Sequence, residues 1–107
     1  MPGADVFDAI ASPVRREILG LLRDGARPVH DLAASFAMTR PAISQHLRVL
    51  RDAGLVSEAR VGRERHYQLD ARPLREVAVW AAHYEDFWRR HARRLEDLLA
   101  ADDGADG

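Results

Sequence analysis

The chain has 107 residues, which is enough for one domain and too few for two. Hydrophobic residues make up 47% and charged residues 31%, an ordinary globular composition without an apolar stretch long enough to cross a membrane. Cysteine is absent, which excludes disulfides, thiolate metal sites and a cysteine nucleophile. Because the N-terminus also lacks the basic-then-apolar pattern of a signal peptide, we expect a cytoplasmic protein.

Charge is distributed unevenly along the chain. All 16 basic residues are arginines, and the net charge is −1. Residues 1–38 have a net charge of −1, residues 39–66 carry six arginines against three acids, and residues 67–107 have a net charge of −3. A local basic face matters more to a polyanion than the overall charge, so the central segment is the candidate nucleic-acid-binding region.

Two helical segments are expected in the first third of the chain. Apolar residues recur at three- and four-residue spacing over residues 6–22, and Ser12 followed by Pro13 interrupts this stripe as a helix start. We therefore expect a short helix followed by a longer one, with Gly25 placed to end it. A second, shorter apolar stripe over residues 29–36 predicts another short helix.

The third predicted helix, residues 39–53, is the most informative segment. Thr39 is suited to its N-cap, Pro41 to its first turn and Gly54 to its end. Its apolar line is Ile43, Leu47 and Leu50, and its polar face holds Arg40, Pro41, Ser44, Gln45, Arg48, Arg51 and Asp52. Arginine can bond guanine and glutamine can bond adenine through two hydrogen bonds each, so this face suits a DNA major groove. The alternative is an ordinary solvated face.

A hairpin follows, with strands at residues 55–61 and 64–70 around a turn of Gly62 and Arg63. Arg60, Arg63 and Arg65 surround its tip, where guanidinium groups can reach phosphates or a minor groove. The alternative is a hairpin charged only to remain soluble, and two acids, Glu58 and Glu64, are close enough in sequence to pair with these arginines.

A long helix is predicted from Pro73, with its apolar positions within an arc of roughly 140°. These positions are Leu74, Val77, Trp80, Ala81, Tyr84, Phe87, Trp88, Leu95, Leu98 and Leu99. Residues 1–101 are expected to form a single domain, and the acidic residues 102–107 a disordered tail. The order of elements predicts a mainly α fold with a small β-hairpin, a winged helix-turn-helix.

Three stretches of sequence resemble the ArsR-type winged-helix repressors of bacteria and archaea. They are ASPVRREIL at 11–19, RPAISQHLRVLRDAGLV at 40–56, and Gly62-Arg63 ahead of Tyr67-Gln68-Leu69. The resemblance covers residues 5–99. It implies a homodimer that binds an imperfect inverted repeat in promoter DNA, with the third helix in the major groove and the wing against the backbone or minor groove.

The resemblance also implies positions for the functional residues. Ser44, Gln45, His46 and Arg48 would contact the groove, Thr39 and Arg40 would lie near phosphates, and Arg63 would act on the wing beside Arg60 and Arg65. His46 sits at the border of the polar and apolar faces, so a packed or phosphate-bonded histidine is as good a reading as a base contact. The first and last helices would form a dimer interface that includes Phe7, Ile10, Trp80, Tyr84, Phe87, Trp88 and Leu95.

The last helix also suits other functions. The aromatic group can also be read as a pocket for an apolar inducer or as a docking surface for a partner protein. His83, Asp86, His91 and Glu96 offer metal-ligand chemistry. However, His83 and Asp86 lie on the charged side of the helix, and their spacing does not match the paired pattern of the resembled metal sensors. We therefore expect no metal and no cofactor.

No catalytic constellation is present in the sequence, so we do not expect an enzyme. The sequence predicts a sequence-specific DNA-binding transcriptional regulator, a dimeric repressor of an inverted-repeat operator, with any small-molecule or protein effector unidentified. The alternative function is a winged-helix protein–protein interaction or ligand-binding module with weak DNA binding. No membrane partner is expected.

Overall fold

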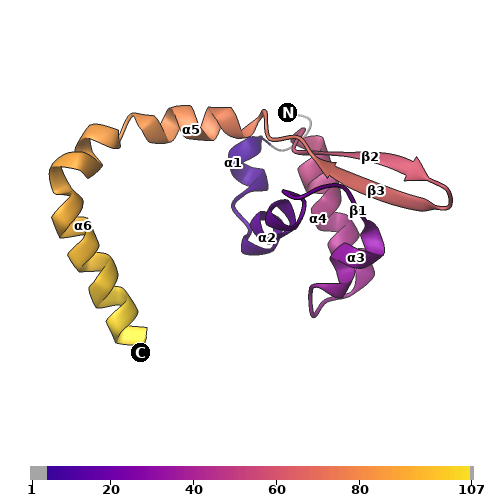
Figure 1. The fold of residues 1–107 in the computed structure, drawn as a ribbon, viewed down its shortest axis with the longest axis horizontal. Coiled ribbons are helices and arrows are strands. Elements are labelled where there is room, and N and C mark those ends of the chain that lie inside the picture. Colours follow the sequence, from indigo (N-terminus) through magenta and orange to yellow (C-terminus); the bar gives the residue numbers. More distant parts are fainter. Residues whose placement is uncertain (1–4, 107) are drawn as a thin grey trace. The chain divides into compact units, whose positions relative to one another are not determined.

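The structure, a computed structural model, describes residues 5–106, with side chains through residue 101. Its elements are α1 (Val6–Ala9), α2 (Pro13–Leu21), β1 (Arg27–Pro28), α3 (Val29–Ala34), α4 (Arg40–Asp52), β2 (Val56–Val61), β3 (Glu64–Leu69), α5 (Leu74–Ala82) and α6 (Glu85–Asp106) (Figure 1). The chain divides into two compact units between Val77 and Ala78. The expected single domain over residues 1–101 stays a prediction.

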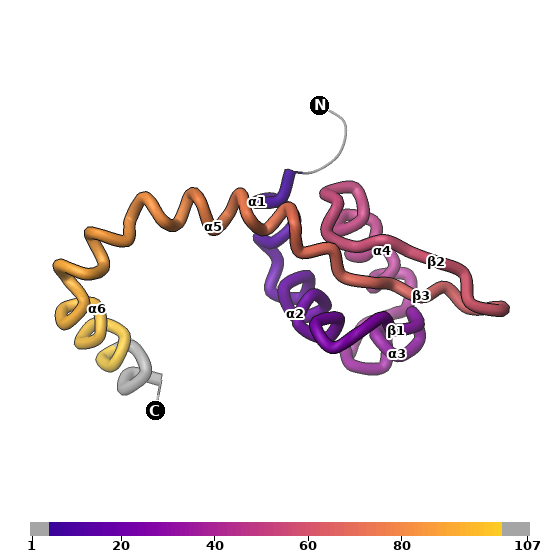
Figure 2. Tube along the Cα trace, turned by 45° about the horizontal axis from the view of Figure 1, so that its top comes forward, coloured from indigo at the N-terminus to yellow at the C-terminus, as the bar shows by residue number. Residues whose placement is uncertain are grey.

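The first unit has one hydrophobic core formed by all of its helices and the sheet. In Figure 2, α2, α3 and α4 gather at the base of the β2–β3 hairpin, which projects away from them. The core residues are Val6, Ala9, Ile18, Leu19, Leu22, Val29, Leu32, Ile43, Leu47, Leu50, Leu55, Val56 and Tyr67. Four helices and a projecting hairpin around this core confirm the predicted winged helix-turn-helix arrangement.

Helix boundaries in the first unit follow the sequence signals. The Ser12 hydroxyl accepts a hydrogen bond from the Arg15 N–H, and Thr39 Oγ1 accepts one from the Ala42 N–H, so each side chain caps a helix that begins with proline in its first turn. These caps confirm the predicted helix starts.

The end of α4 is a Schellman motif centred on Gly54. Gly54 has a φ of +78°, its N–H donates to the Arg51 carbonyl, and the Leu55 N–H donates to the Leu50 carbonyl, both at 2.9 Å. Leu50 and Leu55 are both completely buried, so the motif also fixes the direction in which the chain leaves the helix and enters the wing.

The sheet has the order β1-β3-β2 and is antiparallel throughout. The register of β2 and β3 runs from Val56 opposite Leu69 to Val61 opposite Glu64, which leaves Gly62 and Arg63 as the predicted two-residue turn. Gly62 has a φ of +64°, the left-handed conformation that favours glycine at the first turn position.

The third strand, β1, is not among the elements that the sequence predicts. It has only two residues, Arg27 and Pro28, which pair with Tyr67 and His66. Such a segment is too short to show a strand alternation, and proline is tolerated because β1 is an edge strand. Arg27 also donates from Nε to the Leu21 carbonyl at 2.9 Å, which ties β1 to the end of α2.

The prediction of one long C-terminal helix is wrong. The helix is interrupted at His83 and Tyr84, whose N–H groups bond to the carbonyls three residues earlier, and helical bonding resumes from Trp88 to Tyr84. A second irregularity lies at His91, with φ −116° and ψ 17°. Its ring Nδ1 lies 2.9 Å from the Phe87 carbonyl, the group that the His91 N–H would bond in a regular helix. The ring nitrogen and the backbone N–H of His91 thus face the same potential acceptor.

The backbone of α6 is helical through Asp106, whereas the sequence predicts a disordered segment from residue 102. The side chains of residues 102–106 and the whole of residue 107 lie outside the described part, so disorder of this segment stays a prediction. Among the described helices, none is both long and apolar enough to span a membrane.

The Thr39 cap gives a test of the start of α4. Thr39→Ala is expected to lower the free energy of unfolding by about 1 kcal/mol, because the Ala42 N–H loses its acceptor. Thr39→Ser retains a hydroxyl and should remain within a few tenths of a kcal/mol of the parent protein. Urea denaturation measures both values, and equal stabilities of the two variants would contradict the assigned cap.

Candidate nucleic-acid interface

The faces of α4 are separated as the sequence predicts. Ile43, Leu47 and Leu50 are at most 1% exposed and belong to the core. The exposed residues are Thr39, Arg40, Pro41, Ser44, Gln45, Arg48, Arg51 and Asp52. The polar face that carries arginine, serine and glutamine is therefore open to solvent along the whole helix.

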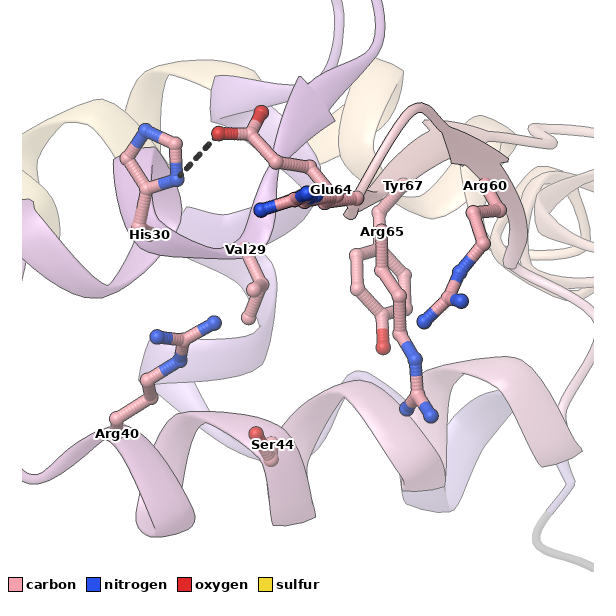
Figure 3. Close-up of a pocket in the computed structure, with 9 residues that line it drawn as sticks. Val29, His30, Arg40, Ser44, Arg60, Glu64, Arg65 and Tyr67 are labelled. Carbon is pink, nitrogen blue, oxygen red and sulfur yellow. Dashed lines mark ion pairs between the residues drawn. The ribbon is translucent and has the colours of Figure 1, made fainter.

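The wing presents one of its faces to α4. Cross-strand pairing sets Arg60 opposite Arg65 and Glu58 opposite Tyr67 on the same face of the hairpin. In Figure 3, Arg65 and Tyr67 reach from β3 toward α4, where Ser44 faces them. The wing and the third predicted helix thus contribute side chains to one surface.

A groove of about 400 Å³ lies between the wing and the two helices of the helix-turn-helix, α3 and α4. It is lined by Val29, His30, Arg40, Ser44, Arg60, Arg63, Glu64, Arg65 and Tyr67. A smaller hollow of about 100 Å³ continues along α4 and is lined by Ser44, Leu47, Arg48, Arg51, Arg65 and Tyr67. We call these two hollows together the basic groove, because six arginines line them.

The two wing acids do not pair with the wing arginines. Glu58 Oε1 accepts a hydrogen bond from Arg51 Nη1 of α4 at 2.8 Å. Burial, together with the hydrogen bond and the charge of Glu58, raises the pKa of the Tyr67 hydroxyl above its usual value of 10.0. Glu58 therefore joins the wing to α4 and holds Tyr67, instead of neutralising the wing tip.

Glu64 is directed toward two histidines. Its Oε1 lies 3.6 Å from His30 Nδ1 of α3, and its Oε2 lies 3.4 Å from His66 Nε2. Among the residues that the structure describes, five arginines of this surface form no ion pair. They are Arg40, Arg48, Arg60, Arg63 and Arg65. None of these five guanidinium groups is paired with Glu58 or Glu64, the two acids that lie near them in the sequence.

His46 is placed differently from its neighbours on α4. It is half-buried on the side of the helix that meets α2, and its Nδ1 lies 3.1 Å from Arg15 Nη1. Burial first, and the positive charge of Arg15 second, lower the pKa of His46 below 6.5, so the ring is neutral at pH 7. The sequence leaves open whether His46 is a packed or phosphate-bonded histidine or a base contact. These contacts are those of a packed histidine, and a DNA contact by His46 stays a prediction.

The residues predicted for the dimer interface fall into two groups. Phe7 of α1 and Ile10, which follows α1, are half-buried and pack against the core of the first unit. Trp80, Tyr84, Phe87 and Trp88 of the second unit are 46–52% exposed, and Leu95 is half-buried. The Trp80 and Tyr84 rings meet edge to face with their centroids 5.5 Å apart. The Phe87 ring stacks on the His91 ring with a centroid distance of 4.4 Å. Their role in a dimer stays a prediction.

One arginine on the charged side of α6 forms two ion pairs. Arg89 lies 3.0 Å from Glu85 and 3.8 Å from Asp86, and the Nδ1 of His91 is engaged with the Phe87 carbonyl. Over the part of the chain that the structure describes, no group of three or more histidine and acidic residues is arranged to hold a metal ion. The absence of a metal and of a cofactor stays a prediction.

Four residues of this region are not among the functional residues that the sequence predicts. Arg15 and Tyr67 stand inside the stretches that carry the resemblance, but their partners are distant in sequence. His30 reaches the groove because β1 brings the start of α3 beside β3. The sequence places Arg51 only on the polar face of α4. Its ion pair with Glu58 depends on how α4 and β2 are placed relative to each other, which the sequence does not show.

A helix-turn-helix whose second helix exposes arginine, serine and glutamine, with a basic hairpin on the same surface, defines a winged-helix DNA-binding protein. Comparisons with known proteins identify the family within this class of DNA-binding proteins. The profile described as "Bacterial regulatory protein, arsR family" matches residues 12–58.

Two regulators of known identity are similar over most of their length. The transcriptional repressor SdpR of Bacillus subtilis is 36% identical over 80 residues, covering 75% of this chain and 89% of SdpR. The HTH-type transcriptional regulator Rv2034 of Mycobacterium tuberculosis is 39% identical over 93 residues, covering 87% of this chain and 84% of Rv2034. A crystal structure of an ArsR family transcriptional regulator matches with a TM-score of 0.69 and 34% identity, over 78% of this chain and 91% of that chain.

This chain belongs to the ArsR family of bacterial regulatory proteins. It is a DNA-binding transcriptional regulator of the repressor type and not an enzyme, as the sequence predicts.

Proposed function

We propose that the protein is a cytoplasmic homodimeric repressor that binds a pseudo-palindromic operator, with α4 in the major groove and the wing on the adjacent backbone or minor groove. The observation that supports this proposal is the basic groove, in which arginines from α4 and from the wing share one surface and only Arg51 is paired with an acid among the described residues. The name of SdpR, a transcriptional repressor, supports repression as the mode of action.

Each part of the basic groove has its own task in this proposal. Arg48, Gln45 and Ser44 read base edges, because they are exposed on the face of α4 opposite the core. Thr39 and Arg40 bind a phosphate at the start of α4, where backbone N–H groups add to the attraction. Arg60, Arg63 and Arg65 bind phosphates or enter a minor groove from the wing.

The operator symmetry follows from the proposed dimer. Two copies of α4 related by a two-fold axis would meet successive major grooves about 34 Å apart, so each half of the operator would contact one protomer. The exposed aromatic residues of the second unit would supply the apolar surface that such a dimer must bury.

Base recognition is tested by selecting bound fragments from genomic DNA with the purified protein. We expect an inverted repeat in the selected fragments. Gln45→Ala and Arg48→Ala should each weaken binding to this sequence by about 1–3 kcal/mol and relax the preference at one position of each half-site. Asp52→Ala, on the same exposed face but without a donor, serves as the control. Binding to the selected sequence no tighter than to random DNA at physiological salt would overturn the proposal.

The role of the wing is tested by salt dependence. Arg63→Ala should weaken binding to all duplexes by a similar factor and reduce the slope of log affinity against log salt by about 1 per protomer, because one phosphate contact is lost. Affinities measured by fluorescence anisotropy at several salt concentrations give the slope. An unchanged slope would show that Arg63 does not contact a phosphate.

The dimer surface is tested by the association of the protein without DNA. Trp88→Ala should raise the dimer dissociation constant by about tenfold or more, because a buried aromatic ring contributes on the order of 2 kcal/mol. Arg93→Ala, an exposed change on the same helix, should leave it unchanged. Analytical ultracentrifugation measures both, and equal values for the two variants would exclude Trp88 from the interface.

A further inference from the structure

Arg15, in the first turn of α2, bonds to three acceptors that come from two other parts of the fold. Its Nε donates to the Ala9 carbonyl at 2.6 Å, its Nη2 donates to the Asp8 carbonyl at 3.1 Å, and its Nη1 lies 3.1 Å from His46 Nδ1. The first two acceptors are at the end of α1, and the third is on α4. We infer that Arg15 is a positioning residue for the DNA-binding helix, because it ties α1 to His46 and holds His46 as the neutral tautomer with its proton on Nε2.

The tautomer follows from the chemistry of the two side chains. A guanidinium group only donates hydrogen bonds, so the ring nitrogen that faces it must present a lone pair. If Nδ1 of His46 is the acceptor, the proton of the neutral ring is on Nε2. The ring then keeps one donor, Nε2–H, and no positive charge.

The position of the guanidinium does not depend on His46. The guanidinium group donates hydrogen bonds to two backbone carbonyls at the end of α1, those of Asp8 and Ala9. Carbonyls at the end of a helix need donors from outside that helix. His46 is consequently oriented by a group that is already fixed. Arg15 of α2 is the charged side chain that acts on His46, while Asp8 of α1 contacts Arg15 through its backbone carbonyl.

This inference rests on the proposed function, in which α4 contacts DNA. A neutral His46 with a fixed Nε2–H can donate to one acceptor on a phosphate or a base edge, and its contribution does not vary with pH in the range where the ring stays neutral. A movable, titrating ring would lack both properties.

Arg16 provides a matched control for Arg15. It is the next residue of α2, and its Nη1 donates to the Ile10 carbonyl at 2.7 Å, just beyond α1. Arg16→Met therefore removes a guanidinium–carbonyl bond in the same region without touching His46. Arg15→Met removes the link to His46 as well, and Arg15→Lys keeps the charge but not the planar fork.

The first experiment observes the histidine rings of the full-length protein by long-range ¹H–¹⁵N NMR, with the His46 signals identified by their loss in His46→Gln. In the parent protein we expect the Nε2–H tautomer and a pKa below 6.5. In Arg15→Met the Nδ1–H tautomer should appear and the pKa of His46 should rise, while Arg16→Met should change neither. A parent His46 with its proton on Nδ1, or identical His46 spectra in Arg15→Met, would overturn the inference.

The second experiment measures DNA affinity on the duplex selected from genomic fragments. In the parent protein, Arg15→Met should weaken DNA binding by about tenfold, the effect of one charge-assisted hydrogen bond. When the same substitution is made in the His46→Gln variant, it should weaken DNA binding much less. Arg16→Met should change the affinity less than twofold. Equal losses from Arg15→Met in both backgrounds would show that Arg15 does not act through His46.

Two further outcomes remain informative. If Arg15→Met does not fold, the inference is tested by the His46 tautomer of the parent protein and by the His46 spectra of Arg15→Lys. Because lysine lacks the planar guanidinium group, we expect the Nδ1–H tautomer of His46 to appear in Arg15→Lys. If the parent protein selects no sequence, the proposed function fails, whereas the NMR result still tests the link between Arg15 and His46.

Discussion

Burial of Ile43, Leu47 and Leu50 determines which face of α4 meets the solvent. These side chains are at most 1% exposed, and burying a large aliphatic side chain contributes about 1.5–3 kcal/mol. Rotating α4 by even a third of a turn would expose this apolar line and bury arginine. The exposed position of Gln45 and Arg48 is thus a consequence of the packing on the opposite side of the helix.

The same packing determines where the wing begins. Leu50 and Leu55 bracket the Schellman motif and are both fully buried, so the chain leaves α4 in a fixed direction and enters β2 at once. The ion pair between Arg51 and Glu58 then joins the last turn of α4 to the wing. The two basic elements are consequently attached to each other through the core and through a surface contact.

The electrostatic potential of this surface depends on the positions of the acidic side chains. Glu58 is engaged by Arg51 and Tyr67, and Glu64 by two histidines. The arginines at the wing tip therefore have no carboxylate partner among the described residues. A chain with a net charge of −1 presents a groove lined by six arginines because most of its acids lie outside residues 39–66.

The sequence was informative wherever local rules decide the structure. Ser12 and Thr39 cap helices, Gly54 and Gly62 take positive φ, and the 3.6-residue period of α4 separates its faces as expected. Features that depend on distant partners were not predictable. β1 has two residues, and Arg15 acts on a histidine 31 residues away. The interruption at His83 and Tyr84 carries no glycine or proline, and the apolar period continues through it, so the pattern predicted one helix where there are two.

The exclusive use of arginine has a consequence for control of the protein after synthesis. Acetylation of lysine removes a positive charge and is a means of weakening contacts with phosphates. With all 16 basic side chains being arginine, no side chain of this chain can be silenced in that way. The guanidinium groups also keep their charge at any physiological pH. The positive charges of the groove are therefore ones that neither lysine acetylation nor a change of pH within the physiological range can remove.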